Sequence, residues 1–307
     1  MIVVIGSINM DLVLRVPRMP LPGETLAGGA FATIAGGKGA NQAVAAARLG
    51  HVPVAMVGCV GDDGFGLTLR AALRADGIDE RHVSTMAGVA TGVASILVDA
   101  SGQNSIVIAG GANDLLSPAH IDAAHDVIAQ ADIVVLQLEV PLATVRHAIA
   151  LAQRLGKPVL LNPAPAQDVP AELLAMVTYL VPNEIEAAML ASSNSERGAS
   201  VAGSDAAVEA AAAKLLAMGC ANVLITLGAD GVYEANAAGR RQYPAERVQA
   251  VDTTAAGDTF IGGFVAALAG GAAPADAIAY GQRAAAWSVT HTGAQTSIPY
   301  KRQLDAL

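Results

Sequence analysis

Short apolar runs alternate along the chain with longer, alanine-rich segments in which apolar residues recur at helical spacing. Six of the short runs are predicted strands: Ile2–Ile5, Pro53–Val57, Ile133–Leu138, Pro158–Leu161, Tyr179–Val181 and Asn222–Thr226. Strands that alternate with helices in this way usually pair in parallel, with helices on both faces of the sheet. The pattern therefore predicts an α/β fold, a three-layer sandwich with a mostly parallel central sheet.

Turn and cap signals mark the ends of three predicted helices. Ser117-Pro118 is expected to cap and open one helix, because proline is tolerated in the first turn. Pro141 opens a second helix, and Gly156 ends it. A third helix is predicted to begin near Ala256–Asp258, where apolar residues take up helical spacing, and to end at Gly270-Gly271.

Two regions break the alternation, because each holds two strand patterns with no helix between them. Asp11–Pro17 is predicted to pair with Thr25–Thr33, and Gly92–Val98 with Ser105–Ile108. We therefore expect a small antiparallel β lid, formed by residues from about 11–34 and 91–109, over a cleft of a single domain that spans 1–307. The polar segment Ser192–Ser204 is a predicted surface loop without a catalytic role.

Composition and charge narrow the functional classes. Apolar residues make up 53% of the chain and the net charge is −9, without a basic cluster, so nucleic acid is not an expected partner. No apolar stretch reaches the ~18 residues that span a bilayer, so no membrane partner is expected either. The N-terminus reads as a strand rather than a signal peptide, and Cys59 and Cys220 fit buried thiols in a reducing cytosol. We therefore expect a cytoplasmic protein.

The glycine-rich segment at 36–41, Gly-Gly-Lys-Gly-Ala-Asn, precedes an alanine-rich helical run. Its glycines allow the backbone to approach a ligand closely at the start of that helix. It is not a P-loop, because Gly39 stands where Ser or Thr is needed, and the chain has no dinucleotide fingerprint after its first strand. Alone, the segment is equally well explained as a glycine-rich turn with a solvated lysine.

The segment at 6–11 follows the first predicted strand, and ligands of open α/β sheets bind beyond strand ends. Asn9 and Asp11 are two residues apart, so both side chains face the same side of an extended chain. An amide and a carboxylate placed together in this way can hold sugar hydroxyls. A strand-end turn with a capping aspartate explains the segment at least as well when it is taken alone.

The third segment, 252–260, contains Ala255-Ala256-Gly257-Asp258 at the predicted start of a helix. Free N–H groups and the positive end of the helix dipole form a site for phosphate oxygens at such a start. A carboxylate there can also reach a substrate hydroxyl. An ordinary helix-capping aspartate is the simpler interpretation of Asp258 in isolation.

Taken together, these segments resemble the ribokinase family of PfkB-type carbohydrate kinases over essentially the whole chain. Further matching motifs are Gly61-Asp-Asp, Gly110-Gly-Ala-Asn113, Asn162-Pro-Ala-Pro165, Pro182-Asn-Glu184, Thr226-Leu-Gly228 and Gly293-Ala-Gln295. The resemblance implies a ribokinase-like fold and the ATP-dependent phosphorylation of D-ribose at its 5-hydroxyl, giving ribose 5-phosphate and ADP. Ribose and ATP are then the expected small-molecule partners.

The resemblance also implies a role for each matched residue. Ribose would be bound by Asn9, Asp11, Gly37, Lys38, Asn41 and Glu139. Asp258 would contact the sugar and act as the base for its 5-hydroxyl, while Ala255, Ala256 and Gly257 would donate N–H groups to the transferring phosphoryl group. The family often has glycine at the position of Ala255, but the N–H group is retained.

Nucleotide and metal residues follow from the same resemblance. ATP would be bordered by Asn183, Thr226, Gly228, Gly231, Gly257 and Gln282, although Gln282 stands where some relatives have His or Asn beside the adenine. Asn183 and Glu186 would organise Mg²⁺ and phosphates through water. An activating K⁺ is implied as well, near Asp252, Thr254, Ser288, His291, Gly293 and Ser297.

Three other functions stay open at this point: a related kinase for a nucleoside or a sugar acid, a nucleotide-dependent oxidoreductase, and a non-catalytic sugar-binding protein. The missing dinucleotide fingerprint argues against the second, and the retained Asp258 segment against the third. Family members commonly dimerise through their lid sheets, and the apolar strand Gly92–Val98 needs a cover. We therefore expect a homodimer.

Overall fold

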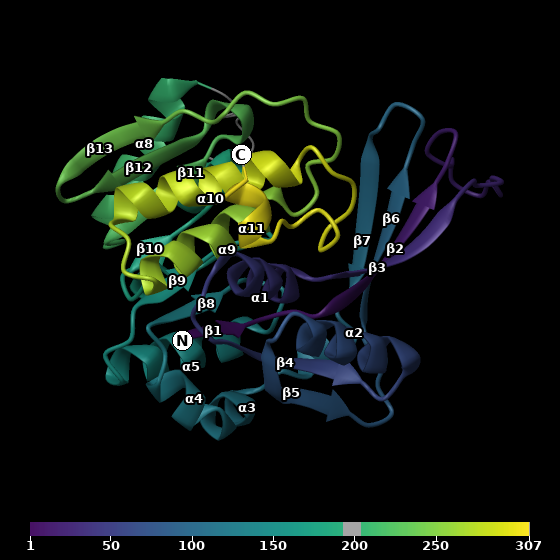
Figure 1. Cartoon of the computed structure of the whole chain (residues 1–307), viewed down its shortest axis with the longest axis horizontal. Helices are drawn as coiled ribbons and strands as arrows, with labels where there is room; N and C mark the ends of the chain where they lie inside the picture. The colour runs from purple at the N-terminus through teal and green to yellow at the C-terminus, as the bar shows by residue number, and fades with distance from the viewer. Residues whose placement is uncertain (193–203, 307) are drawn as a thin grey trace.

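The computed structural model describes residues 1–192 and 204–306, so the predicted loop at 192–204 lies almost wholly outside the described residues. Within those ranges the strands form a large central sheet of nine strands and a separate sheet of four. Helices cover both faces of the large sheet, and the small sheet projects from one end of it (Figure 1). The predicted three-layer α/β fold is confirmed.

The large sheet has the strand order β13-β12-β11-β10-β9-β8-β1-β4-β5. Its strands from β11 to β5 pair in parallel, while β12 and β13 add antiparallel pairs at one edge. The bounds are β1 Ile2–Ile5, β4 Val54–Gly61, β5 Asp79–Met86, β8 Ile133–Leu136, β9 Val159–Leu161, β10 Tyr179–Leu180, β11 Asn222–Thr226, β12 Val232–Asn236 and β13 Gly239–Tyr243. All six strands predicted for this sheet are present.

The side chains of β1 show how one strand contributes to two cores. Val3 and Ile5 pack into a cluster with helices on one face of the sheet, whereas Ile2 and Val4 pack into a second cluster with helices on the other face. This alternation follows from the two-residue period of a strand. A strand buried on both faces is apolar throughout, which explains why β1 was predictable from sequence.

The helices lie in two layers (Figure 1). Their bounds are α1 Lys38–Leu49, α2 Gly64–Ala75, α3 Pro118–Ala123, α4 His125–Ala129, α5 Leu142–Arg154, α6 Ala171–Leu174, α7 Glu184–Ala191, α8 Asp205–Ala217, α9 Ala256–Ala269, α10 Pro274–Ser288 and α11 Lys301–Leu304, with short 3₁₀ turns at Gly111–Leu115 and Gly228–Asp230. The predicted ends of α5 and α9 agree with these bounds. The helix predicted after Ser117 is interrupted at Ala124, which ends α3 and precedes α4. No described helix is long and apolar enough to cross a bilayer.

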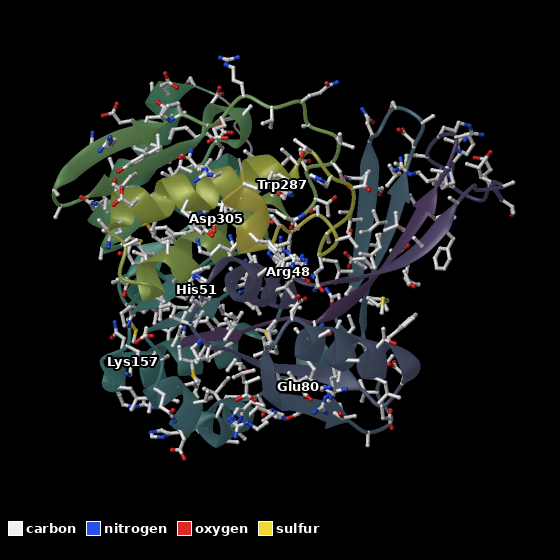
Figure 2. All side chains as sticks on the ribbon, viewed as in Figure 1. Arg48, His51, Glu80, Lys157, Trp287 and Asp305 are labelled. Carbon is white, nitrogen blue, oxygen red and sulfur yellow. The ribbon has the colours of Figure 1, made fainter. Side chains whose placement is uncertain are left out.

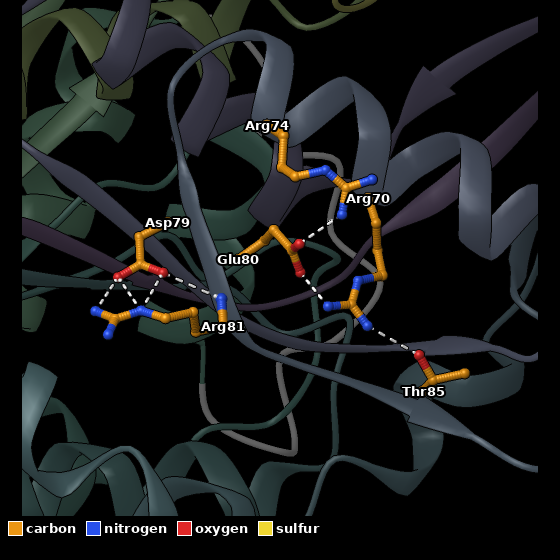
Figure 3. A network of polar contacts seen from close by, with 6 residues as sticks. All are labelled: Arg70, Arg74, Asp79, Glu80, Arg81 and Thr85. Carbon is orange, nitrogen blue, oxygen red and sulfur yellow. Dashed lines mark hydrogen bonds and ion pairs between the residues drawn. The ribbon is translucent and has the colours of Figure 1, made fainter.

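The edge strand β5 was missed by the sequence analysis because most of its side chains are polar. It is fastened to α2 by ion pairs in which Arg70 and Arg74 both contact Glu80, and Arg70 also donates to the Thr85 hydroxyl at 3.0 Å (Figure 3). Asp79 pairs with Arg81 on the same strand (Figure 3). Because ion pairs rather than an apolar face hold this strand in place, a search for alternating hydrophobic residues does not detect it.

The small sheet contains β2 Asn9–Arg15, β3 Phe31–Gly36, β6 Gly92–Val98 and β7 Asn104–Ala109, in the order β3-β2-β6-β7. Each predicted hairpin is antiparallel, but β2 and β6, which join the hairpins, pair in parallel. The predicted strand Thr25–Thr33 is wrong in its first part, since β3 begins only at Phe31. Residues 16–30 connect β2 to β3, a longer connection than the one at 18–24 that the predicted strands leave between them.

Candidate active site

The glycine-rich segment packs directly on the chain that follows β1. Gly37 adopts a positive φ of 89° and immediately precedes α1, and a Cβ there would lie 2.7 Å from the backbone N of Asn9. A Cβ on Gly36 would meet the Asp11 carboxylate at 2.3 Å. Only glycine allows this approach, so the segment is shaped to bring the start of α1 against the predicted sugar residues.

Three carboxylates and one ammonium group meet at this point. Asp11 is buried, and its pKa is raised to about 7, first by burial and then by the neighbouring charges of Glu139 and Asp258, with Lys38 acting in the opposite direction. Asp11, Glu139, Asp258 and Lys38 are called the acid cluster below. Such crowding of carboxylates is typical of a functional site rather than of a core built for stability.

Lys38 provides the positive charge of the acid cluster. Burial opposes its ammonium form, but Asp258, Glu139, Glu186 and Asp11 more than offset that effect and raise its pKa above the usual range. Lys38 is therefore charged at neutral pH. Its backbone N–H also donates to Glu139 Oε2 at 3.2 Å, which ties the glycine-rich segment to the loop after β8.

Two residues that received no role from sequence reasoning orient the predicted sugar residues. The Ser7 hydroxyl donates to Glu139 Oε2 at 2.6 Å. Asn113 donates from Nδ2 to Asn9 Oδ1 at 2.7 Å and accepts from the backbone N–H of Ile8 at 2.9 Å. Because the Asn9 oxygen is engaged, its NH₂ group is the part left for a ligand. Both residues lie in motifs noted in the sequence, at 6–11 and 110–113.

The start of α9 lies beside the acid cluster. Ala255 precedes the helix with φ 59°, a left-handed conformation that is uncommon for a residue other than glycine. The N–H groups of the first turn have no intrahelical acceptor, but that of Ala256 is donated to Thr253 O at 3.2 Å. Of the three N–H groups predicted to bind phosphoryl oxygen, this one is therefore engaged.

Asp258, in the first turn of α9, is held by two amide donors from α1. Asn41 Nδ2 donates to its Oδ2 at 3.0 Å, and Gln42 Nε2 donates to its Oδ1 at 2.9 Å. The carboxylate is only 8% exposed. The structure thus brings Asp258, Asn41 and the other predicted sugar residues together, and it adds Gln42, which sequence reasoning did not single out.

A pocket of about 410 Å³ opens on the other side of the α9 start. Thr226, Gly228, Gly231, Gly257 and Gln282, all predicted to border the nucleotide, line it. Its volume is within the range of small-molecule sites. The structure adds an apolar part that the sequence did not indicate, formed by Ala245, Val248, Ala250, Phe260, Ala285, Ala286 and Val289.

Two of these lining residues are held against each other. Gly231 has φ 99°, and a Cβ there would lie 1.9 Å from Tyr243 O. Gln282 donates from Nε2 to the same carbonyl at 2.9 Å, which links α10 to the end of β13. The amide nitrogen of Gln282 is thus engaged within the protein, and its oxygen is the atom left to face a ligand.

Asn183 and Glu186 form a reciprocal helix cap at the start of α7. Asn183 Oδ1 accepts from the Glu186 N–H, and Glu186 Oε2 accepts from the Asn183 N–H, both at 2.8 Å. Burial raises the pKa of Glu186, with a further rise from Asp258 and opposing effects of the Asn183 hydrogen bond and Lys38. These interactions place Glu186 next to the acid cluster, while Asn183 is not among the residues that line the pocket.

The residues predicted to bind a monovalent cation lie on two chain segments that are joined to each other. Asp252 Oδ1 accepts from the Thr254 N–H and Oδ2 from the Gly293 N–H, both at 2.9 Å. Burial opposes ionisation of Asp252, but the hydrogen bonds from Thr254 and Gly293 more than offset it and lower the pKa. Asp252 is therefore an anion at neutral pH.

The second of these segments is fixed from several sides. Arg48 on α1, which is labelled in Figure 2, donates to the carbonyls of Gln295 and Ile298 and pairs with Asp76. The ring of His291 stacks on that of Trp287, with 4.9 Å between the ring centroids, so its imidazole is directed to α10. Ser288 and Ser297 are buried and donate to backbone carbonyls of their own segment.

Among the described residues, no three His, Cys, Asp or Glu side chains are grouped to hold a metal ion. Asp252 accepts from two backbone N–H groups, and a single carboxylate with nearby backbone carbonyls would suit a hard monovalent ion rather than a transition metal. The carboxylates of the acid cluster do not converge as ligands of one ion, and Lys38 lies among them. A divalent ion there would take most of its oxygen ligands from phosphate or water.

The family described as pfkB family carbohydrate kinase matches residues 1–301. The chain is 47% identical over 300 residues to a ribokinase of Haemophilus influenzae, covering 98% of this chain and 95% of that protein. It is also 40% identical to a deoxyribokinase of Salmonella typhimurium over 305 residues, covering 99% and 97%.

Solved structures agree with the sequence matches. The ribokinase of Arabidopsis thaliana, determined with ribose and ATP, superposes with a TM-score of 0.88 at 32% identity, covering 99% of this chain and 97% of that one. The motifs that carry the resemblance, at 36–41, 110–113 and 252–258, all lie at the acid cluster or beside it. The chain therefore belongs to the pfkB family of carbohydrate kinases.

Proposed function

We propose that this protein is an ATP-dependent ribokinase, which transfers the γ-phosphoryl group of ATP to the 5-hydroxyl of D-ribose and releases ribose 5-phosphate and ADP. One observation carries the proposal: the start of α9 lies between the acid cluster and the large pocket. Gly257 lines the pocket, and the next residue, Asp258, belongs to the acid cluster. A sugar hydroxyl and a terminal phosphate can therefore meet at this helix start.

The sugar is held on the acid-cluster side. Asp11 and Glu139 accept hydrogen bonds from hydroxyl groups, Asn9 and Lys38 donate to hydroxyl oxygens, and Gly37 lets the backbone approach. Asn41 accepts through Oδ1, which is buried without a hydrogen-bond partner in the described structure. Buried polar atoms of this kind are costly unless a ligand completes their bonding, which supports a polyhydroxylated substrate.

Phosphoryl transfer requires positioning and charge stabilisation more than covalent chemistry. Asp258 orients the 5-hydroxyl and takes its proton as the new bond to phosphorus forms. The N–H groups of Ala255 and Gly257, together with the positive end of the α9 dipole, stabilise the charge on the transferring group. The Ala256 N–H joins them only if its bond to Thr253 O is exchanged for phosphate.

The large pocket takes the nucleotide. Thr226, Gly228, Gly231 and Gln282 border it, and its apolar wall suits a flat purine ring. When bound with ATP, Mg²⁺ neutralises phosphate charge. Glu186 and Asn183 would hold its water ligands; the charge of Glu186 interacts with those of Lys38 and Asp258, which fits this role.

K⁺ fits the segments joined by Asp252. Asp252 supplies a charged carboxylate, Thr254 and His291 supply carbonyls, and the loop formed by Ser288, Gly293 and Ser297 closes the site. The site lies just before Ala255 in the chain, so a bound ion would stiffen the α9 start without contacting substrate.

We place the protein in the cytoplasm, since Cys59 and Cys220 are unpaired, buried thiols whose pKa values burial raises to about 11 and about 12.

A coupled ADP-release assay tests the activity and its cation requirement together. Ribose, deoxyribose, fructose, adenosine and a keto-deoxy sugar acid are compared, each in K⁺, Na⁺ and tetramethylammonium. We expect ribose in K⁺ to give the highest kcat/KM. A nucleoside or sugar acid in first place would replace ribose by the related substrate class, and equal rates in all three cations would reject the K⁺ site.

The lid sheet offers a surface for a second copy of the chain. Every residue of its edge strand β7 is exposed, including Ile106, Val107 and Ile108, and Phe31 on β3 is 62% exposed. Two such sheets packed together cover apolar side chains that a monomer leaves in water. In this proposal the lid strands and the large sheet form one domain, 1–307, and the lid is also the dimer interface.

Val107→Asp is expected to convert the dimer to a monomer, because it places a charge on the strand that the second copy covers. Mass measured by light scattering on a size-exclusion column reports the change. Val248→Asp serves as a control, because Val248 is also an exposed valine but lies outside the lid. A monomeric parent protein would contradict the dimer.

A further inference from the structure

Gln42 is the most deeply buried polar side chain next to Asp258, with no exposed surface. Its amide contacts three other side chains, one on α9 and two on the loops that follow β8 and β9. Nε2 donates to Asp258 Oδ1 at 2.9 Å and to Asn162 Oδ1 at 3.2 Å, and Oε1 accepts from Gln137 Nε2 at 2.5 Å. Both ends of this amide are therefore held inside the protein.

A chain of bonds from the backbone determines which way the Gln42 amide points. Asn162 Nδ2 donates to Val181 O at 2.8 Å, and a backbone carbonyl can only accept. The Asn162 oxygen must therefore face Gln42, and the NH₂ group of Gln42 must donate to it. The Gln42 oxygen is then turned to Gln137, and an N–H group is directed at Asp258.

Asn41 and Gln42, which both donate to Asp258, differ in the number of hydrogen bonds that hold their own side chains in place. Asn41 has one bond, to Asp258, and its Oδ1 has no partner in the described structure. Gln42 has partners at both amide ends: Gln137 directly after β8, Asn162 directly after β9, and Asp258 on α9. Asn41 can thus turn to a ligand, whereas Gln42 keeps its position whether or not a ligand is present.

We infer that Gln42 is a positioning residue for phosphoryl transfer, which holds Asp258 Oδ1 by an N–H bond anchored through Asn162 to the Val181 carbonyl. This inference rests on the proposed function, in which Asp258 takes the proton of the sugar hydroxyl. With Oδ1 held, the carboxylate plane is fixed and Oδ2 faces the hydroxyl. Small displacements of a reacting group reduce rates steeply, so this bond affects the rate rather than sugar affinity.

The first test replaces Gln42 by methionine, which has nearly the same volume and no hydrogen-bonding amide. For Gln42→Met we expect kcat to fall by about 10–10²-fold, while the KM for ribose changes by less than about threefold. Titration with ATP shows whether the variant is folded. Thr144→Val is the matched control, because it removes another buried hydrogen bond, from Thr144 Oγ1 to Leu116 O, on α5 away from the site.

The second test replaces the amide by a carboxyl group, as Gln42→Glu, and compares kcat with pH. When protonated, the introduced carboxyl has one O–H group, which can donate to Asp258 in place of the amide, while the second donor, to Asn162, is lost. When ionised, it repels Asp258 and donates to neither residue. We therefore expect its kcat to fall as pH rises, over a range in which the parent protein's kcat does not fall. Asp11, Glu139, Glu186 and Lys38, the other ionisable groups at the site, are the same in both proteins.

The outcomes separate this inference from the proposed function. If Asp258→Asn abolishes turnover but Gln42→Met has the kcat of the parent protein, the role of Gln42 is rejected and the function stands. A Gln42→Met variant that loses kcat and ribose affinity equally, or behaves like Thr144→Val, also rejects it. If Asp258→Asn keeps normal turnover, the proposed function itself fails.

Discussion

Asp258→Asn is expected to lower kcat by about 10²–10⁴-fold and to leave ribose affinity nearly unchanged. The substitution retains the shape of the side chain, and its amide oxygen can still accept from Gln42 Nε2. Its NH₂ group cannot accept from Asn41 Nδ2, so the Asn41 amide must turn over and present its oxygen instead. The amide cannot take a proton from the sugar hydroxyl. Steady-state kinetics with ribose and ATP, together with ribose titration, separate the two effects.

Asp205→Asn is the matched control for this variant. Asp205 is also an aspartate in the first turn of a helix, α8, but it is exposed and far from the acid cluster in sequence. Loss of a charge at a helix start alone changes stability by about 0.3–1 kcal/mol, and kcat should not change. Turnover near that of the parent protein in Asp258→Asn would contradict the assignment of Asp258 as the base.

Asp11→Asn is expected to make the protein more stable and much less active. At pH 8 Asp11 is ionised although it is buried near Glu139 and Asp258, and its pKa stands at about 7 instead of 3.8. Removing that charge should stabilise the fold by roughly 2–4 kcal/mol at pH 8. The loss of charge-assisted hydrogen bonds to hydroxyl groups should lower kcat/KM for ribose by about 10²–10³-fold.

The pH dependence of this effect has a definite sign. Between about pH 4 and pH 7 the folded protein keeps a proton on Asp11 that the unfolded chain releases, so the contribution of this group to stability falls as pH rises. The increase in the free energy of unfolding that Asp11→Asn causes should therefore be near zero at pH 4 and reach its full size above pH 7. Protonation also removes an acceptor from the sugar site, so kcat/KM of the parent protein should decline below pH 7.

Thermal unfolding of both proteins between pH 4 and pH 8, with ribose kinetics over the same range, tests the account of Asp11. A variant that is no more stable than the parent protein at pH 8 would show that ionised Asp11 is not destabilised by burial and by the neighbouring carboxylates. Unchanged ribose kinetics would remove Asp11 from the sugar site.

The sequence allowed the buried parts of the fold to be predicted, because burial on both faces leaves a run such as Ile2–Ile5 with only one interpretation. It did not reveal β5, whose side chains are stabilised by ion pairs to α2, or β12 and β13, which form the exposed antiparallel edge. The parallel pairing of β2 with β6 joins residues more than 80 positions apart. Nothing in the local pattern of either strand distinguishes that pairing from an antiparallel one.

The candidate site divides in the same way. Gly37 and Asp258 stand in short motifs whose local geometry is strict, so the sequence identified them. Gln42, Asn113 and Gln137 are ordinary amides whose importance depends on partners from other elements, and a single sequence does not contain that information. Asn183 and Glu186 cap the start of α7, and the same pattern is expected of a pair that binds Mg²⁺ through water. Only the charge interactions of Glu186 with Lys38 and Asp258 favour the metal role.

The most direct test of the central claim is the identity of the product formed from ribose and ATP, read by ³¹P and ¹³C NMR. We expect one sugar phosphate, with phosphorus coupled to the carbon-5 protons, formed in equal amount to ADP. Phosphate on another carbon would place a different hydroxyl at Asp258. ADP without a sugar phosphate would show that the α9 start does not bring ribose and the terminal phosphate together.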